Sequence, residues 1–407
     1  MTWGKTRIEG SGAALLAACA LLFPGPAAAQ SSPVSPFVEE KLVHDDNVFR
    51  LSSGIDPTPI LGTTARGDTY YVTSGGVNLD LAVSRQRFVG GLSVNHSHYH
   101  RFSALNYTGH DLRGTWLWQW DNDASGEIGY TDSSTLASFA NVAGTTPDRV
   151  KLRHALANGT FLVAPNWKIF AGTNAYEQRN SDVARRVNDV DIVDGELALS
   201  YVTPGGSSFG LSARAESGRF PVLQPVGALQ VDNAYRQYRA GIVADWPVTE
   251  GSRLRGRIDH VSRSYEQIGA RDFDGTTARL QYDWKPTPAL DLVAIAQRDI
   301  SPFEYVRSSF VMVKGLTLRP TYRASATVDL SGSLDIVTRD YLGDASTGLG
   351  LAPVRSERLR AASALLTYRP LRTVTLQVSA LRERRTANVA FGDYTANVVS
   401  FSGRLAF

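Results

Sequence analysis

Few side chains in this 407-residue chain are spaced for chemistry, and the clearest group is a run of alternating histidines. His96, His98 and His100 would lie on one side of a strand, about 6.5 Å apart in succession. Imidazoles at this spacing can bind Zn²⁺ or Cu²⁺. Phe88 and Leu92 share the same parity, however. That parity favours an exposed polar rim above an apolar outward face over a metal site.

The remaining candidate residues form no recognisable catalytic set. A hydrolytic membrane barrel needs a Ser/His pair, or a His with acidic partners, near its outer rim. His154 and His260 stand alone on predicted strands, and no Gly-rich phosphate loop joins a strand to a helix. The single cysteine is Cys19, close to the N-terminus. We therefore expect no enzyme activity, no cofactor and no cysteine-based metal site.

The N-terminal segment has the pattern of a cleaved secretory signal peptide. Lys5 and Arg7 precede an apolar run over residues 13–23, and the small residues 27–29 follow it. The apolar run is shorter than the roughly 20 residues that a membrane span needs. We expect cleavage after Ala29, which removes Cys19 and leaves residues 30–407 as the mature chain.

Composition narrows the class of the mature chain. The sequence is 43% hydrophobic and has 42 basic against 39 acidic residues, a balance that argues against a nucleic-acid partner. After the first thirty residues, no eighteen-residue stretch is apolar and free of charges, so no membrane-spanning helix is predicted.

The elements that position any functional residue are strands. Leu112, Trp116 and Trp120 share one parity, while Asp111 and Arg113 share the other. This alternation with a period of two predicts a strand with one apolar and one polar face. The same alternation recurs over residues 253–259, 327–337 and 373–380.

The connections between strands are of two kinds, and they alternate along the chain. Eight are short and polar or contain proline, and nine are longer, as at residues 51–67 and 342–354. Transmembrane barrels have short periplasmic turns and longer extracellular loops. We therefore predict one antiparallel outer-membrane β-barrel of a Gram-negative bacterium, with about 18 strands (16 to 18), from residues 38–49 to 394–407.

Aromatic residues near the predicted short turns support the same fold. Six of them lie within about three residues of such a turn, as an interfacial girdle requires: Trp120, Trp167, Tyr201, Trp246, Trp284 and Tyr368. Near the end of the chain, Val399, Phe401, Leu405 and the final Phe407 share one parity. A last strand of this pattern resembles the signal that the barrel-assembly machinery recognises.

The predicted lumen face is polar and rich in arginine. Its basic residues are Arg113, Arg214, Arg239, Arg253, Arg255, Arg257 and Arg279, and its acidic residues are Glu127, Glu196, Asp245, Asp259, Asp283, Asp291 and Asp329. These charges can simply pair across strands and keep the wall hydrated, or opposed charged faces can set a field across a pore. Arginine also suits bidentate contacts with anionic or hydroxyl-rich ligands.

Residues 40–51, EKLVHDDNVFRL, resemble the opening of the β-barrel porins encoded in exopolysaccharide operons, the EpsL-type outer-membrane proteins. Residues 315–322 and 365–370 look like that family's recurrent units of strand, aromatic residue and basic or proline turn. The resemblance implies a role in making or exporting an extracellular polysaccharide, beside periplasmic polysaccharide-export proteins. It supplies no catalytic residues.

Two classes of function stay open. The first is a conduit for a polysaccharide or for small hydrophilic solutes, of which a general diffusion porin is the simplest form. The second is a non-conducting scaffold for export proteins. A loop folded into the lumen, such as residues 51–67, would favour this scaffold or a gated pore. Asp45, Asp46 and Asn47, at the outer end of the first strand, can form a turn or bind a cation, and the turn is favoured.

Overall fold

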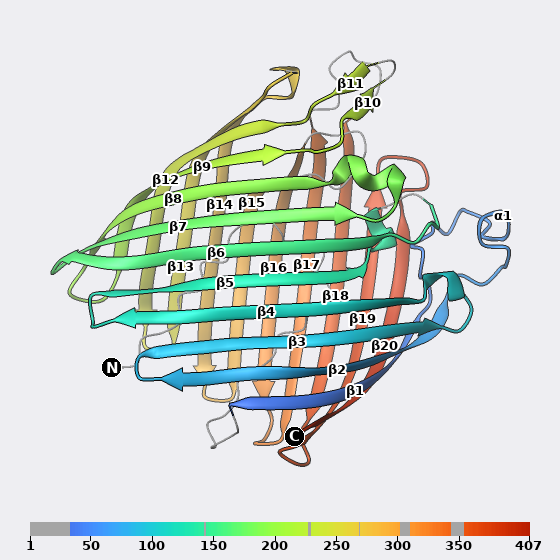
Figure 1. Cartoon of the computed structure of the whole chain (residues 1–407), viewed down its shortest axis with the longest axis horizontal. Helices are drawn as coiled ribbons and strands as arrows, with labels where there is room; N and C mark the ends of the chain where they lie inside the picture. The colour runs from blue at the N-terminus through green and yellow to red at the C-terminus, as the bar shows by residue number, and fades with distance from the viewer. Residues whose placement is uncertain (1–32, 142–143, 227–228, 268, 302–309, 343–353) are drawn as a thin grey trace.

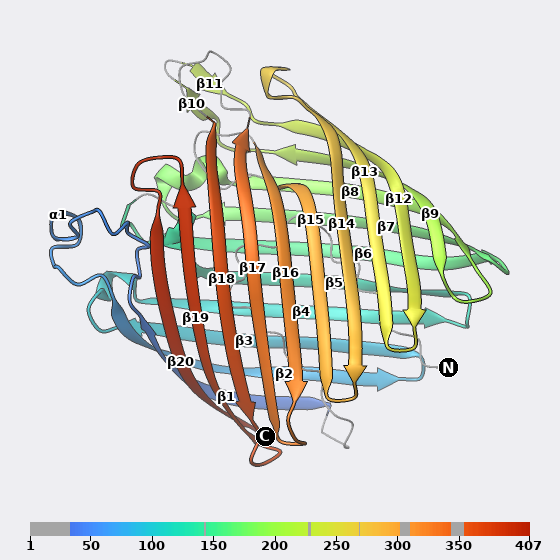
Figure 2. The ribbon, with the colours of Figure 1, turned by 180° about the vertical axis from the view of Figure 1, so that it is seen from behind.

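The computed structural model describes residues 33–141, 144–226, 229–267, 269–301, 310–342 and 354–407, and the predicted signal peptide lies outside this part of the chain. Eighteen antiparallel strands form one closed sheet, because β1 pairs with both β2 and β20 (Figures 1 and 2). This confirms the predicted antiparallel barrel and its strand number.

The barrel strands are β1 Val34–Asp45, β2 Asp68–Val83, β3 Gln86–Tyr99, β4 Tyr107–Trp120, β5 Ala124–Leu136, β6 Arg149–Ala164, β7 Trp167–Asn180, β8 Val190–Val202, β9 Ser208–Arg219, β12 Tyr235–Thr249, β13 Ser252–Tyr265, β14 Phe273–Thr287, β15 Leu290–Ser301, β16 Phe310–Arg323, β17 Val328–Leu342, β18 Arg355–Tyr368, β19 Val374–Ala387 and β20 Tyr394–Ala406. A separate hairpin, β10 Gln224–Val226 and β11 Leu229–Val231, lies in the connection between β9 and β12. The helices are short: α1 Thr58–Leu61, η1 Ser103–Leu105, η2 Phe139–Asn141, η3 Val183–Asn188 and η4 Gly269–Arg271.

No helix in the described ranges is both long and apolar enough to cross a membrane. The described parts of the long connections, with α1 and the β10–β11 hairpin, lie at one end of the barrel, and the short turns lie at the other end with the C-terminus (Figure 1). Two short turns hold non-glycine residues with positive φ, Ser84 at 56° and Asp121 at 46°. This left-handed backbone matches the twist of tight hairpins.

The first strand differs from the prediction of residues 38–49. β1 spans Val34–Asp45, because a turn stops it at the Asp45-Asp46-Asn47 sequence. The buried Asp45 carboxylate accepts hydrogen bonds from the Asn47 backbone N–H at 2.9 Å and from Arg50 Nη1 at 2.8 Å. The structure therefore shows a turn at these three residues.

Arg50 lies outside the membrane-spanning strands, and its pKa is raised above the ordinary value. Burial alone would lower this pKa, but the charge of Asp45 and its hydrogen bond outweigh burial. The Arg50 guanidinium also lies 3.9 Å from Glu383 of β19. Through Arg50 and Glu383, a charged contact thus links the turn after β1 to β19, near the C-terminal end of the chain.

Hydrophobic side chains pack in two clusters at the long-connection end of the barrel. The first cluster joins Phe49, Leu105 and Phe139, and Leu51 and Leu61 of the 51–67 loop pack against it. The α1 segment of that loop extends beyond the end of the barrel in both views (Figures 1 and 2). Loop 51–67 therefore packs on the rim.

The second cluster joins residues from β8, β12, β13, β15 and β16 with Phe220, which directly follows β9. Its members are Val190, Ile192, Phe220, Tyr235, Val261, Tyr265, Ile300, Phe310 and Met312. Next to Phe139 of the first cluster, the carbonyl of Ala140 in η2 accepts a hydrogen bond from Arg385 of β19. Five strands separate β19 from β5, so this contact carries η2 inward over the mouth.

Candidate functional site

The candidate site is the charged wall that β8, β9, β12, β13, β14 and β15 present to the lumen. On β13, Arg253, Arg255, Arg257 and Asp259 alternate with outward residues such as Ile258, which is 60% exposed. Successive side chains of a strand point to opposite faces, so one strand places all four charges inward.

Two of these arginines pair with aspartates of the strands on either side. Arg253 donates from Nε and Nη2 to Asp245 of β12, at 2.6 Å for each bond. Arg255 donates from Nη2 to Asp283 of β14. Each pair joins neighbouring strands, and its side chains stay partly exposed to the lumen, 37% for Arg253 and 24% for Arg255.

Arg257 lies at the centre of the wall and joins three strands. Its Nε donates to Asp259 at 2.7 Å, its Nη1 to Glu196 of β8 at 2.8 Å and its Nη2 to Ser212 of β9 at 3.2 Å. Asp259 is only 2% exposed. This network fixes the guanidinium between two carboxylates.

The other predicted lumen arginines also have polar partners. Arg239 donates to Asp299 of β15 at 2.9 Å, Arg279 donates to Gln297 at 2.9 Å, and Arg113 donates to Asn78 at 3.4 Å. Arg214, on β9 of the same wall, contacts Asp194 at 2.9 Å and Glu216 at 3.4 Å. The wall is therefore a lattice of hydrogen-bonded charges.

The acids of this lattice lie on the same wall as the arginines, on neighbouring strands. The idea of separate, opposed charged faces is wrong for Asp245, Asp283, Asp259 and Glu196, since each contacts an arginine directly. Opposite charges in contact largely cancel each other's field at a distance. What remains exposed to a solute is a dense set of hydrogen-bond donors and acceptors.

Some lumen residues were missed by the sequence analysis. Asp194, Gln297 and Asp299 complete the lattice, and they share the parity of the predicted lumen residues Glu196 of β8 and Asp291 of β15. Arg319 of β16 faces the lumen and is exposed. Within the part of the chain that the structure describes, its guanidinium has no acidic or hydrogen-bonding partner.

The six predicted girdle aromatics lie on the outward face near the short turns. Their exposed fractions run from 38% for Tyr201 to 75% for Trp120. Trp167 and Tyr201 face each other across β7 and β8, with ring centroids 5.3 Å apart. The final Phe407 is 68% exposed, and its backbone N–H donates to the Pro36 carbonyl at 2.9 Å.

The histidines do not form one group: His96, His98 and His260 face outward, and His154 faces the lumen. His96 and His98 point outward, where their rings contact Thr108 at 3.0 Å and Asn106 at 3.3 Å. His154 contacts Asn174 on the lumen face, whereas His260 faces outward beside Asp274 at 3.2 Å. In the described residues, no group of three or more His, Cys, Asp or Glu side chains is placed to hold a metal ion.

A G-x-S-x-G sequence at residues 206–210, which the sequence analysis passed over, lies at the short turn between β8 and β9. The nucleophile elbow of hydrolases is instead a strained turn from a strand into a helix. Ser208 is 6% exposed and opens a strand, so this sequence match lacks the required context.

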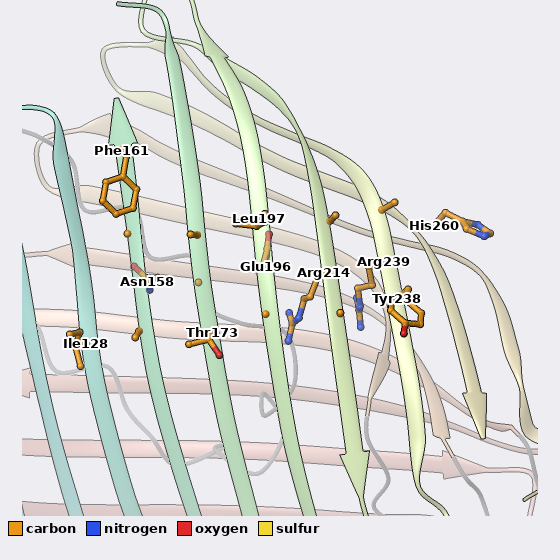
Figure 3. A pocket seen from close by; sticks show the side chains of 18 of the residues that line it. Ile128, Asn158, Phe161, Thr173, Glu196, Leu197, Arg214, Tyr238, Arg239 and His260 are labelled. Atoms are coloured by element: carbon orange, nitrogen blue, oxygen red, sulfur yellow. The ribbon is translucent and has the colours of Figure 1, made fainter. Parts of the chain in front are cut away.

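A shallow hollow of about 1080 Å³ lies on the outward side of the same wall. Its labelled residues come from successive strands between β5 and β13, including Phe161, Leu197, Tyr238 and His260 (Figure 3). Small residues such as Ala157 and Ala213 form its floor. The hollow is apolar, in contrast with the charged lumen face behind it.

Comparisons with known proteins agree with the barrel. A family model described as "Putative beta-barrel porin 2" matches residues 242–407, less than half of the chain. No curated protein sequence matches.

Solved porin structures resemble the chain at low sequence identity. OccK2 (OpdF) of Pseudomonas aeruginosa has 10% identity and a TM-score of 0.46, over 92% of this chain and 97% of that one. OpdO of the same organism has 16% identity and a TM-score of 0.46, over 92% and 97%. OccAB3 of Acinetobacter baumannii has 10% identity and a TM-score of 0.44, over 92% and 99%. By its own closed sheet and its loops, the chain is a porin-like outer-membrane barrel.

Proposed function

We propose that the barrel is a water-filled passage for hydroxyl-rich solutes, and that its physiological cargo is an extracellular polysaccharide on its way out of the cell. The observation that carries the proposal is the lumen lattice of Arg253, Arg255 and Arg257 with their acidic partners. The resemblance of residues 40–51 to porins of exopolysaccharide operons supplies the class of cargo.

Charge pairing favours this kind of solute over a strongly charged one. A bare row of arginines would hold anions tightly, whereas paired groups present donors and acceptors with little net field. Sugar hydroxyls can exchange hydrogen bonds with such a wall as they move along it, at little net cost for each exchange. A barrel of 18 strands is wide enough for an aqueous channel.

A second candidate function, a non-conducting scaffold for periplasmic export proteins, has its own supporting observation. The contact of Arg385 with Ala140 and the packing of Phe49 against Phe139, with ring centroids 4.7 Å apart, draw loops over the mouth. A mouth held in this way suits a gated passage or a closed barrel.

Planar-bilayer recording distinguishes the two functions. Folded, heat-modifiable protein should give steady channels of nanosiemens scale at 1 M KCl, and long neutral oligosaccharides should block them more than monosaccharides at equal mass concentration. Folded protein without conductance would overturn the passage. If the channels conduct but no oligosaccharide blocks them, the barrel is a general diffusion porin, and the proposal of a polysaccharide cargo is overturned.

A further inference from the structure

Four arginines form a cluster on the outward face of β18 and β19, near the ends of these strands that carry the long loops: Arg358, Arg360, Arg382 and Arg384. All four are exposed, and they share the parity of the outward residues Leu366 and Val378. β18 and β19 run side by side between β17 and β20 on the wall shown in Figure 2. We call these four residues the outer arginine cluster.

The register brings like charges together. Arg360 lies directly opposite Arg384, while Arg382 lies opposite Ala362 and Arg358 opposite Thr386. Directly opposed residues have Cβ atoms about 5 Å apart and diagonal neighbours about 7–8 Å, and like charges at the closer distance destabilise a sheet. The cluster therefore needs negative charge from its surroundings.

The protein supplies little negative charge here. Among the described residues, none of the four guanidiniums has an ion-pair or hydrogen-bond partner. Asp340 on β17 is held by Lys314 at 3.1 Å and by Ser356 at 2.9 Å, and Asp46 is held by Asn397 at 2.6 Å. Asp393, just before β20, accepts a hydrogen bond from the Ala387 backbone N–H at 2.6 Å. These three acids are thus already hydrogen-bonded to other residues.

A second outward group of charges, on β5–β8, shows the contrasting case. There Arg153 contacts Asp132 at 3.1 Å and Glu177 at 3.2 Å, and Arg179 contacts Asp191 at 2.6 Å. With Lys151, this group has three basic and three acidic residues. On that wall, acids of the protein neutralise the outward basic residues. On β18 and β19, they do not.

The height of the cluster matches a membrane interface. Tyr368, at the short-turn end of β18, marks the periplasmic interface, and Arg360 lies about 20 Å above it for strands tilted by about 40°. The apolar band of such barrels is about 25 Å tall, so the arginine side chains can extend upward to its outer boundary. Ala364 and Ala380, directly opposite each other, leave a smooth apolar surface below the cluster.

We propose that the outer arginine cluster binds the phosphate groups of a phosphorylated glycolipid in the outer leaflet. Guanidinium groups bind phosphate oxygens through two parallel N–H···O bonds, and a desolvated interface strengthens such bonds. The apolar surface around Ala364 and Ala380 would hold the acyl chains of the same lipid. This proposal is independent of whether the lumen conducts.

Native mass spectrometry of the full-length protein in detergent, titrated with bisphosphorylated lipid A, tests the proposal. Wild-type protein should bind it at least about tenfold more tightly than the fully dephosphorylated lipid with the same acyl chains, since each lost charged hydrogen bond weakens binding by about tenfold or more. R360Q/R384Q should lose this preference, and R360K/R384K should keep part of it. Heat modifiability checks that each variant folds.

The double variant R153Q/R179Q is the matched control, because it removes two outward arginines whose charges are already paired. It should bind lipid A as wild type does. Equal binding of phosphorylated and dephosphorylated lipid, or equal loss in both double variants, would overturn the proposal. Pyrophosphate at up to millimolar concentration serves as a competitor. If it displaces lipid A and binds with the same affinity as lipid A, the cluster is a simple anion site, and the lipid assignment is overturned.

Discussion

Replacing Asp245 and Asp283 with asparagine would uncover the charges of Arg253 and Arg255 without shortening any side chain. Both pairs belong to the lumen lattice and are partly exposed, so the freed charges act on ions in the passage. If the passage conducts, D245N/D283N should change it from nearly unselective to anion-selective.

The size of the change follows from simple electrostatics. An ion passing about 8 Å from a guanidinium in water interacts with it by about 0.5 kcal/mol, and screening at 0.1 M salt reduces this to about half. Two uncovered charges attract anions and repel cations, which separates the two by about 0.9 kcal/mol, or about fivefold in permeability ratio. At 1 M salt the ratio should fall below about twofold.

The assay is the reversal potential of the reconstituted channel under a tenfold KCl gradient. The matched variant R253Q/R255Q should shift it in the opposite direction, and D245N/R253Q, which removes one complete pair, should leave it near wild type. If both double variants shift the potential in the same direction, or neither shifts it at 0.1 M, the paired charges do not face the path of the ions.

Three further predictions concern stability and the mouth. W167A should lower the free energy of unfolding by about 1–3 kcal/mol in urea titrations in vesicles, because Trp167 loses its contact with Tyr201 and its interfacial burial, whereas W167F should keep most of it. D45A should cost about 3 kcal/mol, since it leaves the largely buried Arg50 with the more distant Glu383 as its acidic partner. The control D56A, at an exposed loop position, should be nearly neutral. R385Q should lower the free energy of unfolding by about 1.5–3 kcal/mol and raise single-channel conductance, because it releases η2 from β19. Unchanged conductance would show that this contact does not narrow the mouth.

The barrel could be predicted from the sequence because its signals are local. Alternation with a period of two fixes which side chains face water, and the order of short and long connections fixes the strand count. The last strand is found within one residue of its predicted end, at Ala406. The first strand is displaced by four residues at each end, because the turn at Asp45 depends on Arg50 and Glu383, and Glu383 is remote in sequence.

The charge lattice could be predicted only in part. Parity placed Arg253, Arg255, Arg257 and Asp259 on one face, and the structure has them there. The partners depend on register between strands and on long side chains that reach past a neighbour. Arg257 and Glu196, for example, lie 61 residues apart on β13 and β8, with β12 and β9 between them. No local pattern contains that contact.

The outer arginine cluster could not have been singled out from the sequence for a related reason. Arg358, Arg360, Arg382 and Arg384 resemble Arg153 and Arg179 in parity and in distance from a long loop. What separates the two groups is whether the neighbouring strands supply acids at the same height. β5, β7 and β8 supply Asp132, Glu177 and Asp191 to the second group, whereas β17 and β20 present Thr338 and Thr395 beside the first. On the β5–β8 wall, the outward arginines are thus paired with acids of the protein itself. On the β18–β19 wall, the outward arginines require negatively charged partners from the membrane.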